Sequence, residues 1–160
     1  MVDTIRISWP KGAVLFDEIK NFKHDDWNLD KNGFYALLSG SWDNPEKSWK
    51  NLKLLYIGQA FDQTLRERII QDHPAYKCVR DYQKEHSVDI IVKIGFIKES
   101  TAERLTQQLY DDVECCLIFC NQPLCNTTCK DSYAGRDLQV LNEGDPAGIK
   151  DSCVCSKTNK

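Results

Sequence analysis

Gly33-Phe34-Tyr35-Ala36-Leu37-Leu38 and Leu52-Lys53-Leu54-Leu55-Tyr56-Ile57-Gly58 are two apolar stretches of strand length, each with a glycine at one end. Their length and composition predict two core strands. A third strand is predicted over Asp89–Ile97, which is rich in β-branched residues. The connection Ser39–Asn51 contains glycine, asparagine, proline and serine, and predicts a loop or a long hairpin connection.

One helix is predicted before the third strand in the sequence, and another after it. Thr64–Gln71 has helical periodicity and ends before Pro74, since the residue before a proline avoids the α region. Ser100-Thr101-Ala102-Glu103 matches a capping box and predicts the start of a second helix, which Pro123 closes. The apolar face of this helix is predicted to contain Ala102, Leu105, Leu109, Val113, Cys116, Leu117 and Cys120.

Weaker patterns flank this centre. Alternation over Thr4–Trp9 predicts a strand that Pro10 stops, and Ala13–Phe22 is consistent with a short helix. Leu138–Leu141 predicts a late strand. Antiparallel strands with helices packed on them make an α+β fold, which is the predicted class.

The composition indicates one globular domain, residues 1–160, with 21 basic and 24 acidic residues and a net charge of −3. No apolar run is long enough to span a bilayer and no secretory signal follows Met1, so we expect no membrane contact and a cytoplasmic location. Lys47–Lys98 contains ten basic and six acidic residues, a net of +4 that leaves −7 elsewhere. One mildly basic face is therefore consistent with a polyanionic partner, although the overall acidity argues against tight non-specific nucleic-acid binding.

The eight cysteines are numerous for a chain of this length. Because a cytoplasmic compartment keeps thiols reduced, disulfides are the less favoured interpretation. The spacings are irregular and include no Cys-x2-Cys pair, so buried reduced thiols are favoured over a zinc site. The cysteines are Cys78, Cys115, Cys116, Cys120, Cys125, Cys129, Cys153 and Cys155.

Several polar residues that are not required to form the predicted strands and helices occur in a characteristic order along the chain. Gly33-Phe34-Tyr35 is followed by Tyr56-Ile57-Gly58 and then by Arg68 on the first predicted helix. Glu114 on the second helix is followed by Pro123-x-x-Asn126. This set resembles the GIY-YIG nuclease family, with phenylalanine in place of the isoleucine of the first motif.

The resemblance implies a nuclease core over residues 33–126, with 1–32 and 127–160 as terminal extensions. It also implies a small, mainly antiparallel three-stranded sheet flanked by helices, with an N-terminal strand and a C-terminal extension added to it. The spacing between the two motifs is longer than in compact members of the family, so Ser39–Asn51 would be an insertion.

The resemblance further implies metal-dependent phosphodiester hydrolysis with Mg²⁺ or Mn²⁺. Glu114 is expected to bind the metal and Arg68 the phosphate, with Arg66 as the rival arginine. Tyr35 is expected to be the general base or to position the water, with His73 as a relay. Tyr56 would hold the water or the scissile phosphate, and Asn126 would brace the glutamate helix.

Further residues are expected to contact the substrate. Gln59 follows the second motif, where some members of the family have a lysine. The segment Tyr76–Ser87 interleaves basic and aromatic residues, a mixture that suits phosphates and bases, although an exposed helical or loop connection explains it equally well. The basic residues of this segment are Lys77, Arg80 and Lys84.

Three functions follow from these patterns. The first is a metal-dependent endonuclease of restriction, repair or mobile-element type, acting on duplex DNA. The second is a catalytically inactive or weak nucleic-acid-binding or interaction module of the same fold. The third is a thiol- or zinc-dependent protein built on Cys115–Cys129. The patterns leave open the recognition site, the choice between DNA and RNA, and whether the protein is a homodimer.

Overall fold

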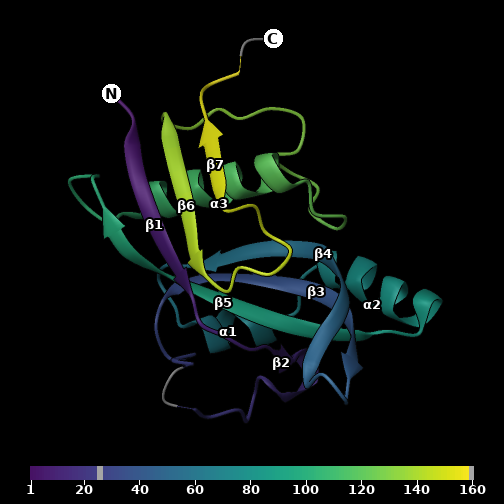
Figure 1. The fold of residues 1–160 in the computed structure, drawn as a ribbon. Helices are drawn as coiled ribbons and strands as arrows, with labels where there is room; N and C mark the ends of the chain where they lie inside the picture. Colours follow the sequence, from purple (N-terminus) through teal and green to yellow (C-terminus); the bar gives the residue numbers. More distant parts are fainter. Residues whose placement is uncertain (25–26, 159–160) are drawn as a thin grey trace.

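The computed structural model describes residues 1–24 and 27–158 and contains one strongly curled, seven-stranded sheet (Figure 1). The strands are β1 (Asp3–Trp9), β2 (Val14–Leu15), β3 (Gly33–Asp43), β4 (Ser48–Ala60), β5 (Asp89–Ser100), β6 (Leu138–Gly144) and β7 (Ser152–Cys155). Their order is β4-β3-β5-β1-β6-β7, and β2 also pairs with β5. The β1–β6 pair is parallel and the other pairs are antiparallel, so the sheet is mixed.

The predicted small three-stranded sheet is wrong. Strands β4, β3 and β5 are antiparallel neighbours, but β1 from the N-terminal segment and β6 and β7 from the C-terminal segment continue the same sheet. β1 is paired on both of its edges, with β5 and with β6. A strand with an apolar face buries that face by joining a packed sheet, so both terminal segments become part of it.

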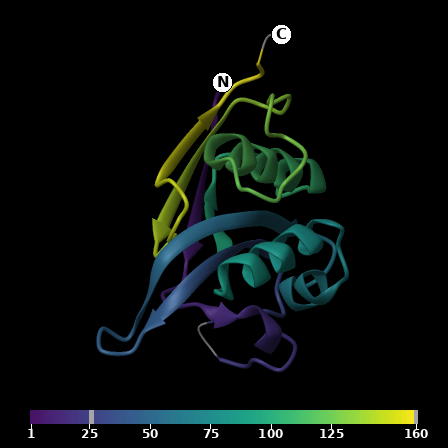
Figure 2. The ribbon, with the colours of Figure 1, turned by 90° about the vertical axis from the view of Figure 1, so that its right-hand side faces the viewer.

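Three α-helices of the described chain pack on the sheet: α1 (Leu65–Ile70), α2 (Ala75–His86) and α3 (Gln107–Asn121). Figures 1 and 2 show α3 on one side of β3 and β4, and α1 and α2 on the other. Because side chains alternate along a strand, Phe34 packs in the cluster that includes α3, and Tyr35 in the cluster of α1 and α2. None of the described helices is long and apolar enough to cross a membrane.

The hairpin between β3 and β4 is more regular than its composition predicts. β3 runs to Asp43 and β4 starts at Ser48, so most of Ser39–Asn51 is strand. Trp42 lies opposite Trp49, with ring centroids 5.3 Å apart. Cross-strand aromatic pairs stabilise hairpins, and this pair offsets the turn-forming residues around it. The predicted helix in the N-terminal segment is also wrong, because β2 and the short 3-10 helix Phe16–Glu18 lie there.

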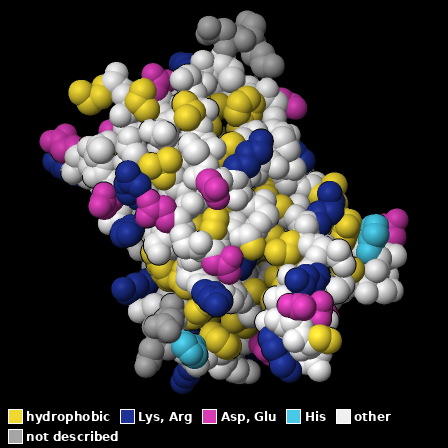
Figure 3. All heavy atoms as spheres, viewed as in Figure 1, with side chains coloured by type: hydrophobic (Ala, Val, Ile, Leu, Met, Phe, Trp, Pro, Cys, Tyr) yellow, Lys and Arg dark blue, Asp and Glu magenta, His cyan; other side chains and the backbone are white. Residues whose placement is uncertain are grey.

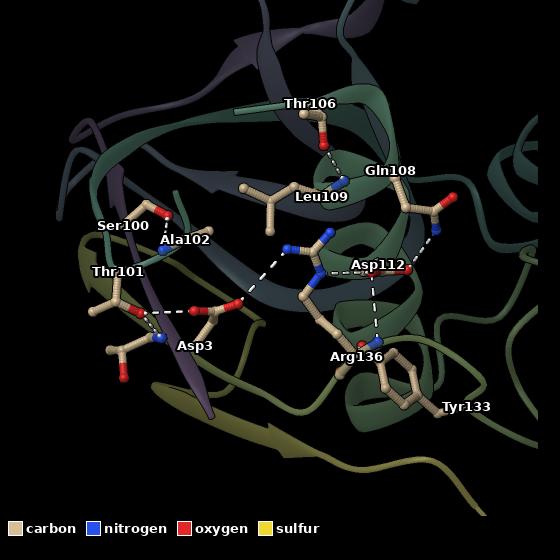
Figure 4. Close-up of polar contacts among 11 residues, drawn as sticks. Asp3, Ser100, Thr101, Ala102, Thr106, Gln108, Leu109, Asp112, Tyr133 and Arg136 are labelled. Carbon is tan, nitrogen blue, oxygen red and sulfur yellow. Dashed lines mark hydrogen bonds and ion pairs between the residues drawn. The ribbon is translucent and has the colours of Figure 1, made fainter. Parts of the chain in front are cut away.

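The start of α3 differs from the capping-box prediction. Ser100 is the last residue of β5, and its hydroxyl accepts a hydrogen bond from the Ala102 amide at 3.0 Å, which forms a turn. The helix begins one residue after Thr106, whose hydroxyl accepts from the Leu109 amide at 3.1 Å (Figure 4). Leu105 therefore precedes the helix and is 50% exposed, although it was predicted on the buried face.

All eight cysteines form disulfides, so the prediction of reduced thiols is wrong, and so is the alternative of a thiol or zinc site at Cys115–Cys129. A disulfide-bonded sulfur has no thiolate to offer to a metal. One bond joins α2 to the segment after α3, one closes that segment back onto α3, and two attach α3 to β7. The pairs are Cys78–Cys125, Cys115–Cys129, Cys116–Cys155 and Cys120–Cys153.

Candidate active site

A cavity of about 270 Å³ lies at β4, where α1, α2, α3 and the segment after α3 come together. Five of the six residues predicted to be catalytic line this cavity, and the sixth, Tyr35, is fully buried in the core. The fold therefore gathers residues from five parts of the chain. The lining residues are Tyr56, Gln59, Arg68, His73, Ala75, Glu114, Ile118, Asn126, Thr127 and Thr128.

The register between β3 and β4 explains the glycine of the second motif. Tyr35 is paired with Gly58, and a Cβ atom at Gly58 would lie 2.5 Å from Cζ of the Tyr35 ring. The Tyr35 hydroxyl is 3.1 Å from that of Tyr76, which donates to the Ile69 carbonyl at 3.0 Å. Because Tyr76 has only one proton to donate, its oxygen accepts the hydrogen bond from Tyr35.

Both motif tyrosines remain protonated at neutral pH. Burial and the neighbouring tyrosines raise the pKa of Tyr35 well above its ordinary value. Burial and Glu114 raise the pKa of Tyr56 to about 12. Tyr35 is therefore poorly suited to be a general base and acts as a buried support for the cavity wall. Tyr56, whose ring centroid is 5.4 Å from that of His73, brings a phenol donor to the cavity.

Arg68, and not its rival Arg66, reaches the cavity. Arg66 forms an ion pair with Asp30 at 3.1 Å and donates to the Ile19 carbonyl at 2.5 Å, which ties α1 to the N-terminal segment. Among the described residues, none forms a hydrogen bond or ion pair with the Arg68 guanidinium. Burial lowers the pKa of Arg68, but three nearby tyrosines and Glu114 outweigh this effect and raise it. Arg68 is thus a permanent cation that is available to a ligand.

His73 brings a neutral ring to the cavity. Burial and the Arg68 cation lower its pKa, and Asp72 only partly offsets them. Its Nδ1 accepts a hydrogen bond from the Ala75 amide at 3.1 Å, so we assign the proton of the neutral ring to Nε2. In this tautomer the other ring nitrogen is a donor and not a base.

Glu114 is the acid of the cavity and lies half-buried on α3. Burial and then Asp111 raise its pKa to about 7, against the opposing effects of Arg68 and of a hydrogen bond from the Gln59 backbone. No ion pair within the described part of the chain neutralises it. A carboxylate in this environment is short of positive charge.

Asn126 fixes the far wall of the cavity to β4. Its Oδ1 accepts from the Ile57 amide at 2.9 Å, and its Nδ2 donates to the Ile57 carbonyl at 3.0 Å. The adjacent Cys125 amide donates to the Leu55 carbonyl at 2.7 Å, so this segment runs along β4 as another strand would. Asn126 therefore holds the segment after α3 to the backbone of β4, whereas it was predicted to brace the glutamate helix.

Two disulfides fasten the same wall on either side of Asn126. Cys78–Cys125 connects it to α2, and Cys115–Cys129 connects it to α3 one residue after Glu114. Thr127 and Thr128 lie between these attachments and line the cavity. The fastening limits the movement of this wall relative to the two helices.

Most of the residues predicted to bind substrate lie outside the cavity. Gln59 lines it, and the other four do not. Lys77 pairs with Asp81 at 2.8 Å, Arg80 pairs with Asp17, and Lys84 is exposed on α2. His73, Lys77 and Arg80 line a second, open groove of about 810 Å³, which thus adjoins the cavity at His73. On the face shown in Figure 3, basic and acidic side chains are interspersed and form no basic stripe.

The oxygen acceptors of the cavity fit a divalent cation. Glu114 supplies a carboxylate, and Oε1 of Gln59 is buried without a hydrogen-bond partner in the described structure. Mg²⁺ and Mn²⁺ prefer such oxygen ligands, and Mg²⁺ tolerates few protein ligands because it keeps several waters. Within residues 1–24 and 27–158, no cluster of three or more His, Cys, Asp or Glu side chains could form a cage around a metal. The cavity therefore suits a cation that shares its coordination with water and substrate.

Three contributors to this site were not predicted from the sequence: Asp111, the pair Thr127 and Thr128, and the structural role of Tyr76. Asp111 lies three residues before Glu114 and so shares a helix face with it, a spacing that the sequence already contains. Tyr76 is one of the aromatic residues of the segment Tyr76–Ser87, whose composition suits phosphates and bases, but it is buried and accepts the hydrogen bond from Tyr35. Nothing in the sequence pattern singled out the two threonines.

Comparisons with protein-family models, with curated proteins and with solved structures found no match for this chain. The function therefore has to be inferred from the cavity and from the ordered motifs that line it.

Proposed function

We propose that this protein is a metal-dependent endonuclease that hydrolyses phosphodiester bonds in DNA. The observation that carries the proposal is the division of polar groups within one small cavity. Arg68, Tyr56 and His73 bring hydrogen-bond donors, whereas Glu114 and Gln59 bring oxygen acceptors. A phosphodiester bound beside a divalent cation needs both kinds of group, and the order of the GIY-YIG-like motifs supports the same reaction.

The donors suit the phosphoryl group. The Arg68 guanidinium presents a planar array of N–H groups to phosphate oxygens, and the Tyr56 phenol and the His73 N–H add neutral donors. Prearranged donors of this kind stabilise the charge that develops on the oxygens in the transition state. A divalent cation bound at Glu114 would polarise a phosphoryl oxygen and lower the pKa of its bound water.

We also propose that the protein works in an oxidising compartment, in contrast to the cytoplasmic location expected from its sequence. Four disulfides support this, because reducing compartments rarely maintain such bonds. Activity should accordingly be assayed on the oxidised protein, without added thiol.

A nucleic-acid-binding module without catalysis is the second candidate. The net charge of −3 and the interspersed charges in Figure 3 favour weak, localised contacts over a long phosphate-binding surface. In this alternative the cavity would hold a phosphate without cleaving it.

Incubation with supercoiled plasmid tests the proposal. The oxidised protein is mixed with plasmid in Mg²⁺, Mn²⁺ or EDTA, beside Glu114→Gln and the surface control Glu85→Gln, which changes an exposed acid of α2. We expect metal-dependent nicking by the wild type and by Glu85→Gln, and none with EDTA or Glu114→Gln. A parallel assay on structured RNA tests the choice of nucleic acid. Binding without cleavage supports the module, and neither binding nor cleavage contradicts both candidates.

A further inference from the structure

Gln59 contains an unusual atom. Among buried side-chain nitrogen and oxygen atoms of the described residues, its Oε1 alone has no hydrogen-bond partner. A buried acceptor without a partner destabilises the folded protein, and native proteins contain few of them. An acceptor retained at that cost, on a residue that lines the candidate active site, requires an explanation.

The orientation of the Gln59 amide follows from its neighbour Asp111. The amide Nε2 donates to Asp111 Oδ1 at 2.9 Å, and Gln107 Nε2 donates to the same oxygen at 2.8 Å. An ionised carboxylate only accepts hydrogen bonds, so the nitrogen of the Gln59 amide must face Asp111. The oxygen is therefore the group that is left over, and it can bind only a donor or a cation.

The position of this oxygen restricts its partner further. Gln59 and Glu114 line the same cavity, and the Gln59 backbone lies close enough to the Glu114 carboxylate to lower its pKa. A phosphate oxygen is an acceptor and would be repelled by Oε1, so Gln59 is unsuited to the phosphate contact predicted from the sequence. A divalent cation, in contrast, would satisfy the amide oxygen and the carboxylate together.

We propose that Oε1 of Gln59 is the second protein oxygen, after the Glu114 carboxylate, that binds the divalent cation. Asp111 acts as a positioning residue because it fixes the orientation of the Gln59 amide. This inference rests on the proposed function, since it identifies how the same cavity holds its metal.

Metal binding is measured on the oxidised protein without nucleic acid, by electron paramagnetic resonance of free Mn²⁺ during a titration. Gln59→Met keeps the length of the side chain and removes the oxygen, and we expect it to weaken Mn²⁺ binding about tenfold or more. Asp111→Asn keeps the shape but lets the Gln59 amide turn, so a smaller loss is expected. Gln107→Met is the matched control, because Gln107 binds the same Asp111 oxygen but is exposed and does not line the cavity.

The outcomes separate this inference from the proposed function. Weaker binding by Gln59→Met, with Gln107→Met unchanged and Glu114→Gln inactive in binding, supports both. Equal affinity of Gln59→Met and wild type overturns the inference and leaves the proposed function standing. No Mn²⁺ binding by folded wild-type protein at millimolar metal overturns both. If Gln59→Met does not fold, Gln59→Leu decides in its place: unchanged affinity overturns the inference, and weaker affinity supports it.

Discussion

Asp112 and Glu114 lie two residues apart on α3, yet their carboxylates have opposite environments. Asp112 is 6% exposed and accepts hydrogen bonds from Gln108 at 2.8 Å and from Arg136 Nε at 2.9 Å (Figure 4). Arg136 also lies 3.6 Å from Asp3, so this network joins α3 to β1. Glu114 lacks an ion-pair partner among the described residues, and its pKa is raised to about 7.

The difference follows from the geometry of the helix. Two successive steps rotate the side chain by about 200°, so the two acids point to opposite sides of α3. Asp112 points to the C-terminal segment and pairs with Arg136 there, whereas Glu114 lines the cavity at β4. An acid that is satisfied stabilises the fold, whereas an acid kept short of positive charge is typical of a functional site.

Glu114→Gln is expected to have the largest effect. Removing the charge that is proposed to hold the metal should slow plasmid nicking by at least about 10³-fold, which corresponds to about 4 kcal/mol. Asp112→Asn should retain the wild-type rate in the protein that remains folded. Initial rates with Mg²⁺ measure both, and equal losses in the two variants would abolish the distinction between the two acids.

Asp112→Ala should have the largest effect on stability. Arg136 and Gln108 lose their buried acceptor, and we expect the free energy of unfolding to fall by about 3 kcal/mol. Urea unfolding with the disulfides intact, followed by circular dichroism at pH 7, measures this loss. A change of less than about 0.5 kcal/mol would show that the network in Figure 4 contributes little.

The stability of the metal-free protein should depend on pH through Glu114. Its pKa is raised in the folded state, so its favourable contribution is complete below the ordinary value of 4.5 and is lost as pH rises through about 7. Relative to Glu114→Gln, the wild type should lose about 2 kcal/mol between pH 4.5 and 8, after allowance for partial exposure. Unfolding curves in EDTA test this, and a difference between the two proteins that does not vary with pH would contradict the raised pKa.

The smallest expected effects on stability come from substitutions at the start of α3, the helix that carries both acids. Thr106→Ala removes the cap of α3 and should cost about 1 kcal/mol, whereas Ser100→Ala, in the turn before it, should cost only a few tenths. Thermal unfolding distinguishes them, and the nicking rate of both variants should be unchanged. A larger loss for Ser100→Ala would mean that the predicted capping box, and not Thr106, is the stronger N-terminal cap.

Much of the candidate site could be predicted because its residues lie in local patterns. The strand Gly33–Leu38 and the helix Thr64–Gln71 were correctly located, and the motifs identified Tyr56, Arg68 and Glu114 as lining residues. The orientation of Gln59 could not be predicted in this way. It depends on a hydrogen bond to a residue 52 positions away, which exists only once α3 has packed on β4.

The cysteines show how a local signal can be overlooked. Cys116 and Cys120 are four residues apart on a helix, a rise of about 6 Å, and Cys153 and Cys155 are two apart on a strand, a rise of about 7 Å. These lengths match, so the two pairs can face each other and form two disulfides. The prediction failed because the expected cytoplasmic location outweighed this spacing, and because the strand Ser152–Cys155 was not foreseen.

The sequence by itself determined where the central apolar strands run and which polar residues occur in the nuclease-like order. These features depend on neighbours within a turn or a strand. Only the tertiary structure decided that the terminal segments extend the sheet, that all cysteines pair, and that Asp112 is satisfied while Glu114 is not. The contacts that settle these outcomes join distant positions, and their free energy is gained only when the whole sheet forms.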